Sequence, residues 1–399
     1  MVPESGARVG EAGSGGRIPQ PGKLALPVLL GAFGTFGLFA GTFAVLLADL
    51  SRALELSPGP LGFALFVGAA ASILAMAFLG WTADRLGRRM FLIISGGVMG
   101  VGIAALSFAG GYAALLAALI VLHAASGLYD VGINAAAVDL EKVTRRRIMA
   151  VLHAAFSAGG FLGALSAGAL LSAGVDYRHV YLGVLLPLGV VIFAVATTRF
   201  PPPGRAPGDE DRGERPALHR NLPLLLIAGI ATLALLSEGE MEHWSGVYLR
   251  QTLGLPALVG GSGVAVFYGA RAAGRLGAAL VIARFGDRLT LRAAGMMAAG
   301  GMTLALATRE PSLVIVGFLV VGLALSAVAP IAFSAAGDLA PERAGAAISV
   351  LTTLGYGGFL LGPVTVGGLA EVLGLRIALG IIAVSGLLIF ALALRLKGP

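Results

Sequence analysis

The chain alternates long apolar runs with short polar turns, and this pattern predicts helices that cross a membrane. A helix needs ~20 apolar residues to span the hydrocarbon layer, and each run is about that long. The polar turns between the runs must then face water. The pattern predicts twelve helices, at residues 24–48, 59–82, 89–109, 112–138, 147–174, 178–199, 222–250, 258–283, 290–308, 313–337, 344–371 and 375–396.

Composition supports an all-α membrane protein. Hydrophobic residues make up 57% of the chain, charged residues only 12%, and the mean hydropathy is +0.91, whereas a soluble domain is about 25% charged. No run shows the ~10-residue alternation of a membrane β-barrel strand. The chain has no cysteine, which excludes disulfides, thiolate metal sites and cysteine nucleophiles.

One long polar segment, residues 200–221, interrupts the helices after the sixth. We expect it to be a cytosolic linker between two six-helix bundles, at 24–199 and 222–396. Residues 1–23 are rich in glycine, proline and charge and lack an apolar run, so they do not resemble a cleavable signal. We expect them to form a disordered cytosolic tail.

An internal repeat relates the two predicted bundles. Gly87 recurs as Gly286 and Asp139 recurs as Asp338, each 199 positions later. Parallel repeats of this kind, with a binding site between them, are typical of one group of secondary transporters.

The distribution of basic residues predicts the orientation. With both termini in the cytosol, inside segments hold 21 of the 28 lysines and arginines, outside loops hold five, and two lie within a helix. This bias fits the positive-inside rule, so we expect both termini to be cytosolic. The composition, rich in alanine, glycine and arginine, suggests a bacterium, and we therefore expect the bacterial cytoplasmic (inner) membrane. The bias of basic residues also accounts for the net charge of +7 without nucleic-acid binding.

A cluster of charges lies between the second and third predicted helices. The pattern Gly-x-x-x-Asp-Arg-x-Gly-Arg-Arg, which begins at Gly80 and contains Asp84, Arg85, Gly87 and Arg88, resembles the signature of the major facilitator superfamily. The resemblance covers residues 24 to 396 and implies two six-helix repeats around a central site.

The resemblance also implies a conformational latch. Asp84 would dock on the backbone near Ala344 to Ala347, where a helix N-terminus favours an anion, and Arg88 would reach Asp139. The alternative is a plain positive-inside anchor, which would not need the acid. The second copy has Ala283 in place of Asp84, so we expect a weaker latch or none in that half.

Ionisable residues inside a membrane span mark substrate or proton pathways by default. His123, Asp130 and Asn134 share one face of the fourth helix, and His153 and Ser157 share one face of the fifth. We predict that Asp130 carries the coupling proton and that the other four contact the substrate. The alternative for Asn134, His153 and Ser157 is hydrogen bonding that only joins the helices.

The run from Asp130 to Asn134, with Leu152-His-Ala-Ala-Phe-Ser157 in the next helix, resembles the fucose/proton symporter branch of the superfamily. That branch has a protonatable acid at the position of Asp130. Burial in an otherwise uncharged helix favours the neutral acid, while Asn134, Ser157 and water support the ionised form. The branch has a second acid in helix 1, whereas this helix 1 has none before Asp49.

In the second half, Arg271 lies near the middle of the eighth predicted helix and needs an acidic partner. Glu238 is the nearest candidate by depth. Glu238 and Glu240 are further candidates for proton coupling, and Arg271 and Trp244 are candidates for substrate binding. We expect Glu242 and the neighbouring histidine to belong to the outer vestibule surface.

Motifs for ATP binding or metallopeptidase chemistry are absent from the sequence, so we expect neither an enzyme nor a primary pump, and no cofactor or metal. The predicted function is secondary active transport of a small polar solute, such as a sugar, coupled to protons through alternating access. The alternatives are a proton-antiport exporter of drugs or metabolites and a sensor that binds without transport. The expected partners are the solute, protons and the lipid bilayer, around a monomer.

Overall fold

The computed structural model describes residue 22 and residues 24–201, 221–339 and 344–396, and every regular element in these ranges is helical. The predicted tail and most of the predicted linker lie outside them. The all-α membrane fold predicted from the hydropathy pattern is confirmed.

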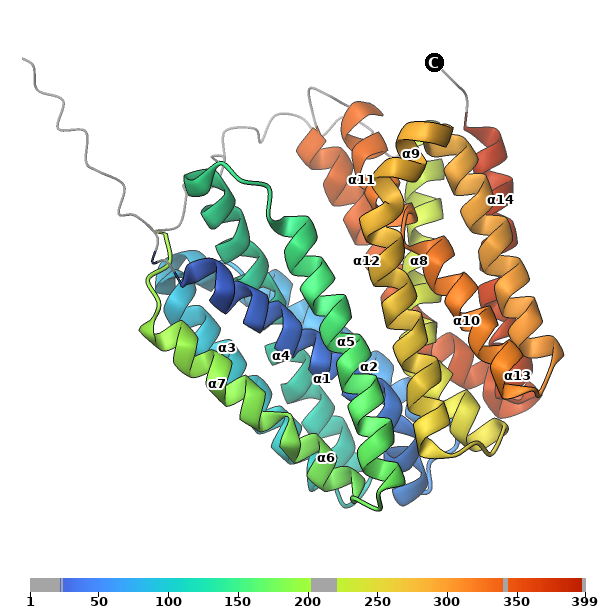
Figure 1. Cartoon of the computed structure of the whole chain (residues 1–399), viewed down its shortest axis with the longest axis horizontal. Coiled ribbons are helices and arrows are strands. Elements are labelled where there is room, and N and C mark those ends of the chain that lie inside the picture. Colours follow the sequence, from blue (N-terminus) through green and yellow to red (C-terminus); the bar gives the residue numbers. More distant parts are fainter. Residues whose placement is uncertain (1–21, 23, 202–220, 340–343, 397–399) are drawn as a thin grey trace, which may run out of the picture.

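Two groups of helices lie side by side in Figure 1, the first half of the chain on the left and the second on the right. The first group contains α1 (Ala25–Ala53), α2 (Pro58–Leu79), α3 (Thr82–Ser107), α4 (Tyr112–Thr144), α5 (Met149–Ser172), α6 (Tyr177–Gly183) and α7 (Leu185–Thr197). The second contains α8 (Leu222–Val247), the π-helical turn η2 (Tyr248–Thr252), α9 (Ala257–Ala307), α10 (Pro311–Leu325), α11 (Val328–Leu339), α12 (Ala344–Leu373), α13 (Leu375–Ala378) and α14 (Gly380–Arg395).

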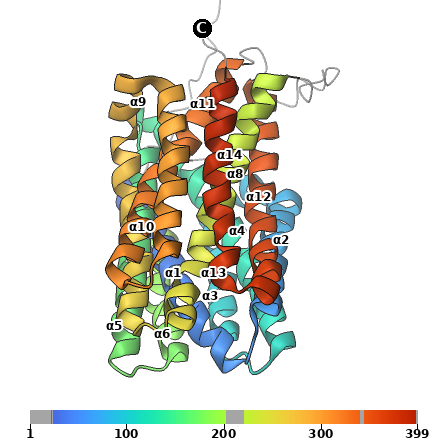
Figure 2. The ribbon, with the colours of Figure 1, turned by 90° about the vertical axis from the view of Figure 1, so that its right-hand side faces the viewer.

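Eleven helical stretches of the described chain are long and apolar enough to cross a membrane, one fewer than predicted. The difference lies in α9, whose 51 residues contain the eighth and ninth predicted helices. At Gly286 the backbone leaves the helical region, with φ 72° and ψ 164°. The chain turns there without a loop, and its two legs run side by side (Figure 2).

Gly87 adopts the same conformation as Gly286, with φ 76° and ψ 153° inside α3. A positive φ of this size strains any residue with a Cβ, which explains glycine at both positions. The sequence repeat therefore corresponds to one local turn used twice.

Small residues let α1 and α5 pack with their backbones in contact. A Cβ added at Gly37 or Gly41 would overlap backbone atoms of Phe156 or Gly160, and one added at Gly163 would overlap the backbone of Leu38. Glycines spaced four residues apart thus allow the close helix approach that is typical of membrane helices.

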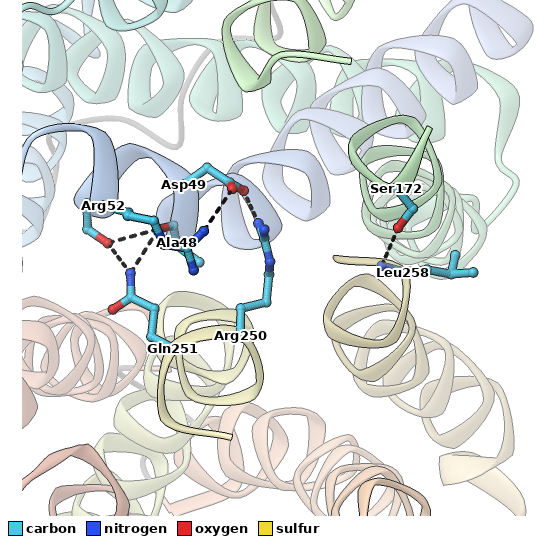
Figure 3. Close-up of polar contacts among 8 residues, drawn as sticks. Ala48, Asp49, Arg52, Ser172, Arg250, Gln251 and Leu258 are labelled. Atoms are coloured by element: carbon cyan, nitrogen blue, oxygen red, sulfur yellow. Dashed lines mark hydrogen bonds and ion pairs between the residues drawn. The ribbon is translucent and has the colours of Figure 1, made fainter. Parts of the chain in front are cut away.

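The two halves are joined by polar contacts at one end of the molecule, which we name the distal end because α1 begins and α14 ends at the opposite, termini end (Figure 1). Asp49 of α1 forms an ion pair with Arg250 of η2. The Gln251 side chain donates to the Ala48 carbonyl at 2.8 Å and to the Ser51 hydroxyl at 2.7 Å. Figure 3 shows how η2 presents both side chains to α1.

Two further contacts complete this distal closure. The backbone N–H of Gly59 donates to Glu371 of α12 at 2.7 Å, and that of Leu258 donates to Ser172 of α5 at 2.9 Å (Figure 3). Together with the contacts of Asp49 and Gln251, they bind the two halves to each other at the distal end. Toward the termini end the two groups of helices lean apart in Figure 1.

Candidate functional site

A cavity of about 220 Å³ lies between the two halves. Helices α1, α2, α4 and α5 wall it from one side, and α8, α9 and α12 from the other. Tyr356, which lines it from α12, is 40% exposed. The cavity is therefore central, shared by both halves, and accessible to solvent.

Asp130 of α4 is half-buried in the wall of this cavity. The Asn134 amide donates to Asp130 Oδ1 at 2.9 Å and to the Asp130 backbone carbonyl at 2.9 Å. The one-turn spacing of the two residues makes both contacts possible. The two form the polar pair that the sequence pattern predicted, with a carboxylate oxygen held by an amide and the group open to the cavity.

His123 lines the cavity from the same face of α4 as Asp130, as predicted. Its Nδ1 lies 3.1 Å from the Leu119 carbonyl, and its ring packs edge-on against Phe43 with the ring centroids 5.6 Å apart. The fifth-helix candidates are placed differently. His153 packs edge-on against Phe33 and Ser157 is buried. Neither residue lines the cavity.

Arg271 of α9 is buried among acidic residues of α8. Its Nη2 lies 2.6 Å from Glu238 Oε2, and its Nη1 contacts Glu242. Arg275 lies 3.7 Å from the same Glu238 oxygen. The predicted contact between Arg271 and Glu238 is present, and it belongs to a network of two acids and two arginines.

Glu242 and His243 correct the sequence interpretation, which assigned them to an outer surface. Glu242 is half-buried and His243 is buried, and both line the central cavity. The reason is helical geometry: Glu238 and Glu242 lie one turn apart on one face of α8. That spacing was the available signal for a shared arginine.

Glu240 and Trp244 lie inside the second half, away from the cavity wall. Both are fully buried. The Glu240 carboxylate has no hydrogen-bond partner in the described part of the chain, and a Cβ at Gly362 of α12 would overlap its Oε1. Glu240 therefore fills a space that only glycine leaves open.

The charged turn forms one of the two predicted contacts. Arg88 Nε donates to Asp139 Oδ2 at 2.7 Å, and its Nη1 donates to Asp84 Oδ1 at 2.7 Å. The Asp84 side chain is 57% exposed. The docking of Asp84 on the backbone near Ala344 to Ala347 stays a prediction.

The other members of the signature shape this turn. Gly80 ends α2, Gly87 reverses the chain within α3, and the Arg85 guanidinium lies 4.4 Å from the centre of the Trp81 ring. These residues are well placed to hold the turn, and none of them lines the central cavity.

Sequence reasoning missed the aromatic character of the cavity. Its wall carries seven phenylalanine and tyrosine rings from four helices: Phe36, Phe39, Phe43, Phe156, Tyr268, Tyr356 and Phe359. The three rings of α1 are spaced by three and four residues, a pattern that equally describes an ordinary core stripe. Only the position of α1 between the halves distinguishes the two.

These features define a class: a helical membrane protein with two halves, one central cavity and a closure at one end. The sequence profile of the Major Facilitator Superfamily matches residues 28–307 and 245–399. The chain belongs to this superfamily. It is a multi-pass membrane transporter, not an enzyme.

Curated relatives agree with this assignment. An uncharacterised MFS-type transporter of Yersinia pestis is 30% identical over 352 residues, covering 88% of this chain and 90% of the relative. The membrane protein MosC of Rhizobium meliloti is 29% identical and covers 94% of this chain and 91% of its own length. The finer resemblance to the fucose/proton symporter branch stays a prediction.

Solved structures share the fold. A mutant form of the nucleoside transporter NupG superposes with a TM-score of 0.78 at 15% identity, covering 94% of this chain and 100% of that one. A bacterial homologue of the human lysosomal transporter Spinster, inward-facing and occupied, gives a TM-score of 0.77 at 14% identity, with 93% and 96% covered. At such identities the likeness concerns the fold alone.

Proposed function

We propose that the protein is a proton-coupled secondary transporter that moves a small organic solute by alternating access, with Asp130 as the proton-carrying group. The observation that carries the proposal is the position of Asp130. It lies in the cavity wall between the two halves, half-buried, with Asn134 as its hydrogen-bond partner. A carboxyl group at the interface of two moving halves can meet two different environments in one cycle.

The distribution of basic residues supports a cytosolic location for the termini end. On that orientation, the distal closure faces the outside and the cavity is accessible from the cytosol. The contacts of Asp49, Gln251 and Ser172 would then break when the outer side opens. The Arg88 cluster at the termini end would take part in closing the other side.

The test is substrate-induced proton movement in proteoliposomes that contain a trapped pH indicator. Sugars, nucleosides, amino acids, organic acids and amines are added in turn at equal internal and external pH. A solute that drives proton flux is a substrate, and the sign of the pH change separates symport from antiport. Asp130→Asn should abolish the proton movement, and Glu55→Gln, which changes an exposed carboxylate, should leave it intact.

The proposal fails if Asp130→Asn, inserted and folded as well as the wild type, still couples solute movement to protons. It also fails if a solute is transported with no proton flux in the wild type. Under the first outcome, Glu238 or Glu240 would be the next candidates for the proton-carrying group.

A further inference from the structure

We propose that the central cavity binds an organic cation, an amine or quaternary ammonium that carries a flat apolar ring, and that this cation and the proton compete for Asp130. The proposal rests on the proposed function, because it names the substrate class of the same site. Two properties of the cavity carry it: the charge of its wall and its aromatic rings.

The wall of the cavity has an excess of negative charge. It contains two carboxylates, Asp130 and Glu242, and no lysine or arginine among the described residues. Glu242 is compensated from behind the wall by Arg271. In the described ranges Asp130 forms no ion pair, and its hydrogen-bond partner is the neutral amide of Asn134. A positive charge on the ligand would supply the missing partner.

The other titratable groups around Asp130 do not supply that charge permanently. The cavity wall holds His123 on the same helix, His243 on α8, Tyr268 on α9 and Tyr356 on α12. In the described structure α1 and α2 contribute no titratable side chain to the wall, and α5 contributes Phe156. These histidines and tyrosines can all be neutral near neutral pH.

The aromatic rings suit a cation with an apolar body. Phe36 and Phe156 meet edge to face with centroids 5.6 Å apart, and both line the same cavity as Asp130. Tyr356 lines the same cavity as Asp130 from the opposite half, and Phe359 follows one turn later on α12. Ring faces attract ammonium groups, most strongly where water is excluded, and they also pack against a flat ring.

The neutral polar groups of the wall do not determine the charge of the ligand. The wall holds two serines, and the hydroxyl of one of them, Ser126, already donates to the His123 carbonyl at 3.0 Å. Hydrogen-bonding groups are also present on Tyr268 and His243, so the charge of the wall, and not its neutral polar groups, selects a cation. An anion would face Asp130 and Glu242 without an available cation.

The shared carboxylate has a consequence for coupling. Asp130 can hold one proton or one cation, so the entry of a monovalent cation requires the release of the proton. No covalent bond forms or breaks except that between the proton and the carboxylate, and the proton passes to water. Transport would then be one-for-one exchange of a cation for a proton, with no net charge moved in a full cycle.

The first test compares ligands of one shape and different charge by titration calorimetry on the purified protein. The probes are phenethylammonium, 2-phenylethanol and phenylacetate, with benzyltrimethylammonium as a cation that carries no exchangeable proton and tetramethylammonium as a cation without a ring. We expect both aromatic cations to bind at least ~10-fold more tightly than the neutral, anionic and ring-free probes. Mildly acidic solution should weaken their binding.

The second test uses variants of the wall. Asp130→Asn should lower the affinity for benzyltrimethylammonium at least ~10-fold, whereas Glu55→Gln should not change it. Tyr356→Leu should lower it more than Tyr356→Phe, which keeps the ring. Tyr356 is well exposed to the cavity, so neither change should disturb folding.

Three results would overturn the inference: equal binding of the neutral probe and the cations, no binding of any aromatic cation, or unchanged cation affinity in Asp130→Asn. The last result can be told apart from failure of the proposed function. If Asp130→Asn keeps the cation affinity but loses proton movement with another solute, Asp130 carries the proton and the substrate is of another class. If proton movement persists, the proposed function itself is wrong.

Discussion

The acidic residues on the two sides of the cavity differ in whether an arginine pairs with them. In the second half, Glu238 and Glu242 are held by Arg271, with Arg275 close to Glu238. In the first half, the described partner of Asp130 is an amide. A compensated charge inside a membrane can serve as structure, because its burial is offset by its partner. An uncompensated charge stabilises nothing by itself, so we assign it to binding and coupling.

We expect the largest effect from removal of Arg271, the cation that pairs with the acids of the second half. Arg271→Ala leaves Glu238 and Glu242 buried without their main partner, and breaking a buried pair in this way costs about 3–5 kcal/mol. We expect a large loss of thermal stability in detergent, partly restored by Arg271→Ala with Glu238→Gln. Restoration should be incomplete because Glu242 remains.

The matched control is Arg52→Ala. The Arg52 side chain is 57% exposed and lies 3.7 Å from Asp49, and an exposed pair contributes at most about 1 kcal/mol. Equal stability of Arg271→Ala and Arg271→Ala with Glu238→Gln would show that the pair does not balance charge as we describe.

The next variant places a cation beside Asp130 in the first half. Asn134→Lys places an ammonium group one helical turn after Asp130, a favourable spacing for an ion pair. We expect benzyltrimethylammonium binding to fall at least ~10-fold because the cavity loses its excess negative charge. Asn134→Ala, which removes the amide without adding charge, should have a smaller effect. Wild-type affinity in Asn134→Lys would contradict the role of charge.

A smaller effect is expected at the distal end, where an acid of the first half is compensated by a cation of the second. Arg250→Gln removes the partner of Asp49 and should shift the equilibrium toward an open distal end. Because the chain has no cysteine, Ser51→Cys, at a buried position of the distal closure, can report this opening by its rate of labelling with an impermeant maleimide. We expect a rise of ~3- to 10-fold.

Arg52→Gln is the control for this shift, since Arg52 lies near the same acid but is exposed. An unchanged labelling rate in Arg250→Gln, with normal folding, would show that the ion pair does not hold the distal end closed.

The sequence was sufficient for the membrane helices and for several contacts, because hydropathy and helical periodicity act locally. The contacts between Arg271 and Glu238 and between Arg88 and Asp139 followed from depth in the membrane and from family resemblance. The place of Glu242 could have been predicted from its one-turn spacing to Glu238. Each of these contacts can be predicted from the spacing of residues on one helix or from a known motif.

The aromatic wall could not be predicted in this way. Phe39 on α1 and Phe359 on α12 line one cavity only through the packing of two halves that are far apart in the sequence. Likewise, the hydropathy pattern predicted a loop between the eighth and ninth helices. The structure has only a tight turn there, which the positive φ of Gly286 allows. The aromatic wall depends on tertiary packing and the turn at Gly286 depends on backbone conformation. A hydropathy pattern contains information on neither.

The most direct test of the account is to count protons released when a cation binds. Purified protein in weakly buffered, mildly acidic detergent solution is titrated with benzyltrimethylammonium, and the pH change is converted to protons per bound ligand. The account predicts release of up to about one proton per cation in the wild type and none in Asp130→Asn at ligand concentrations that still give measurable binding. Binding without proton release in the wild type, or the same release in Asp130→Asn, would contradict it.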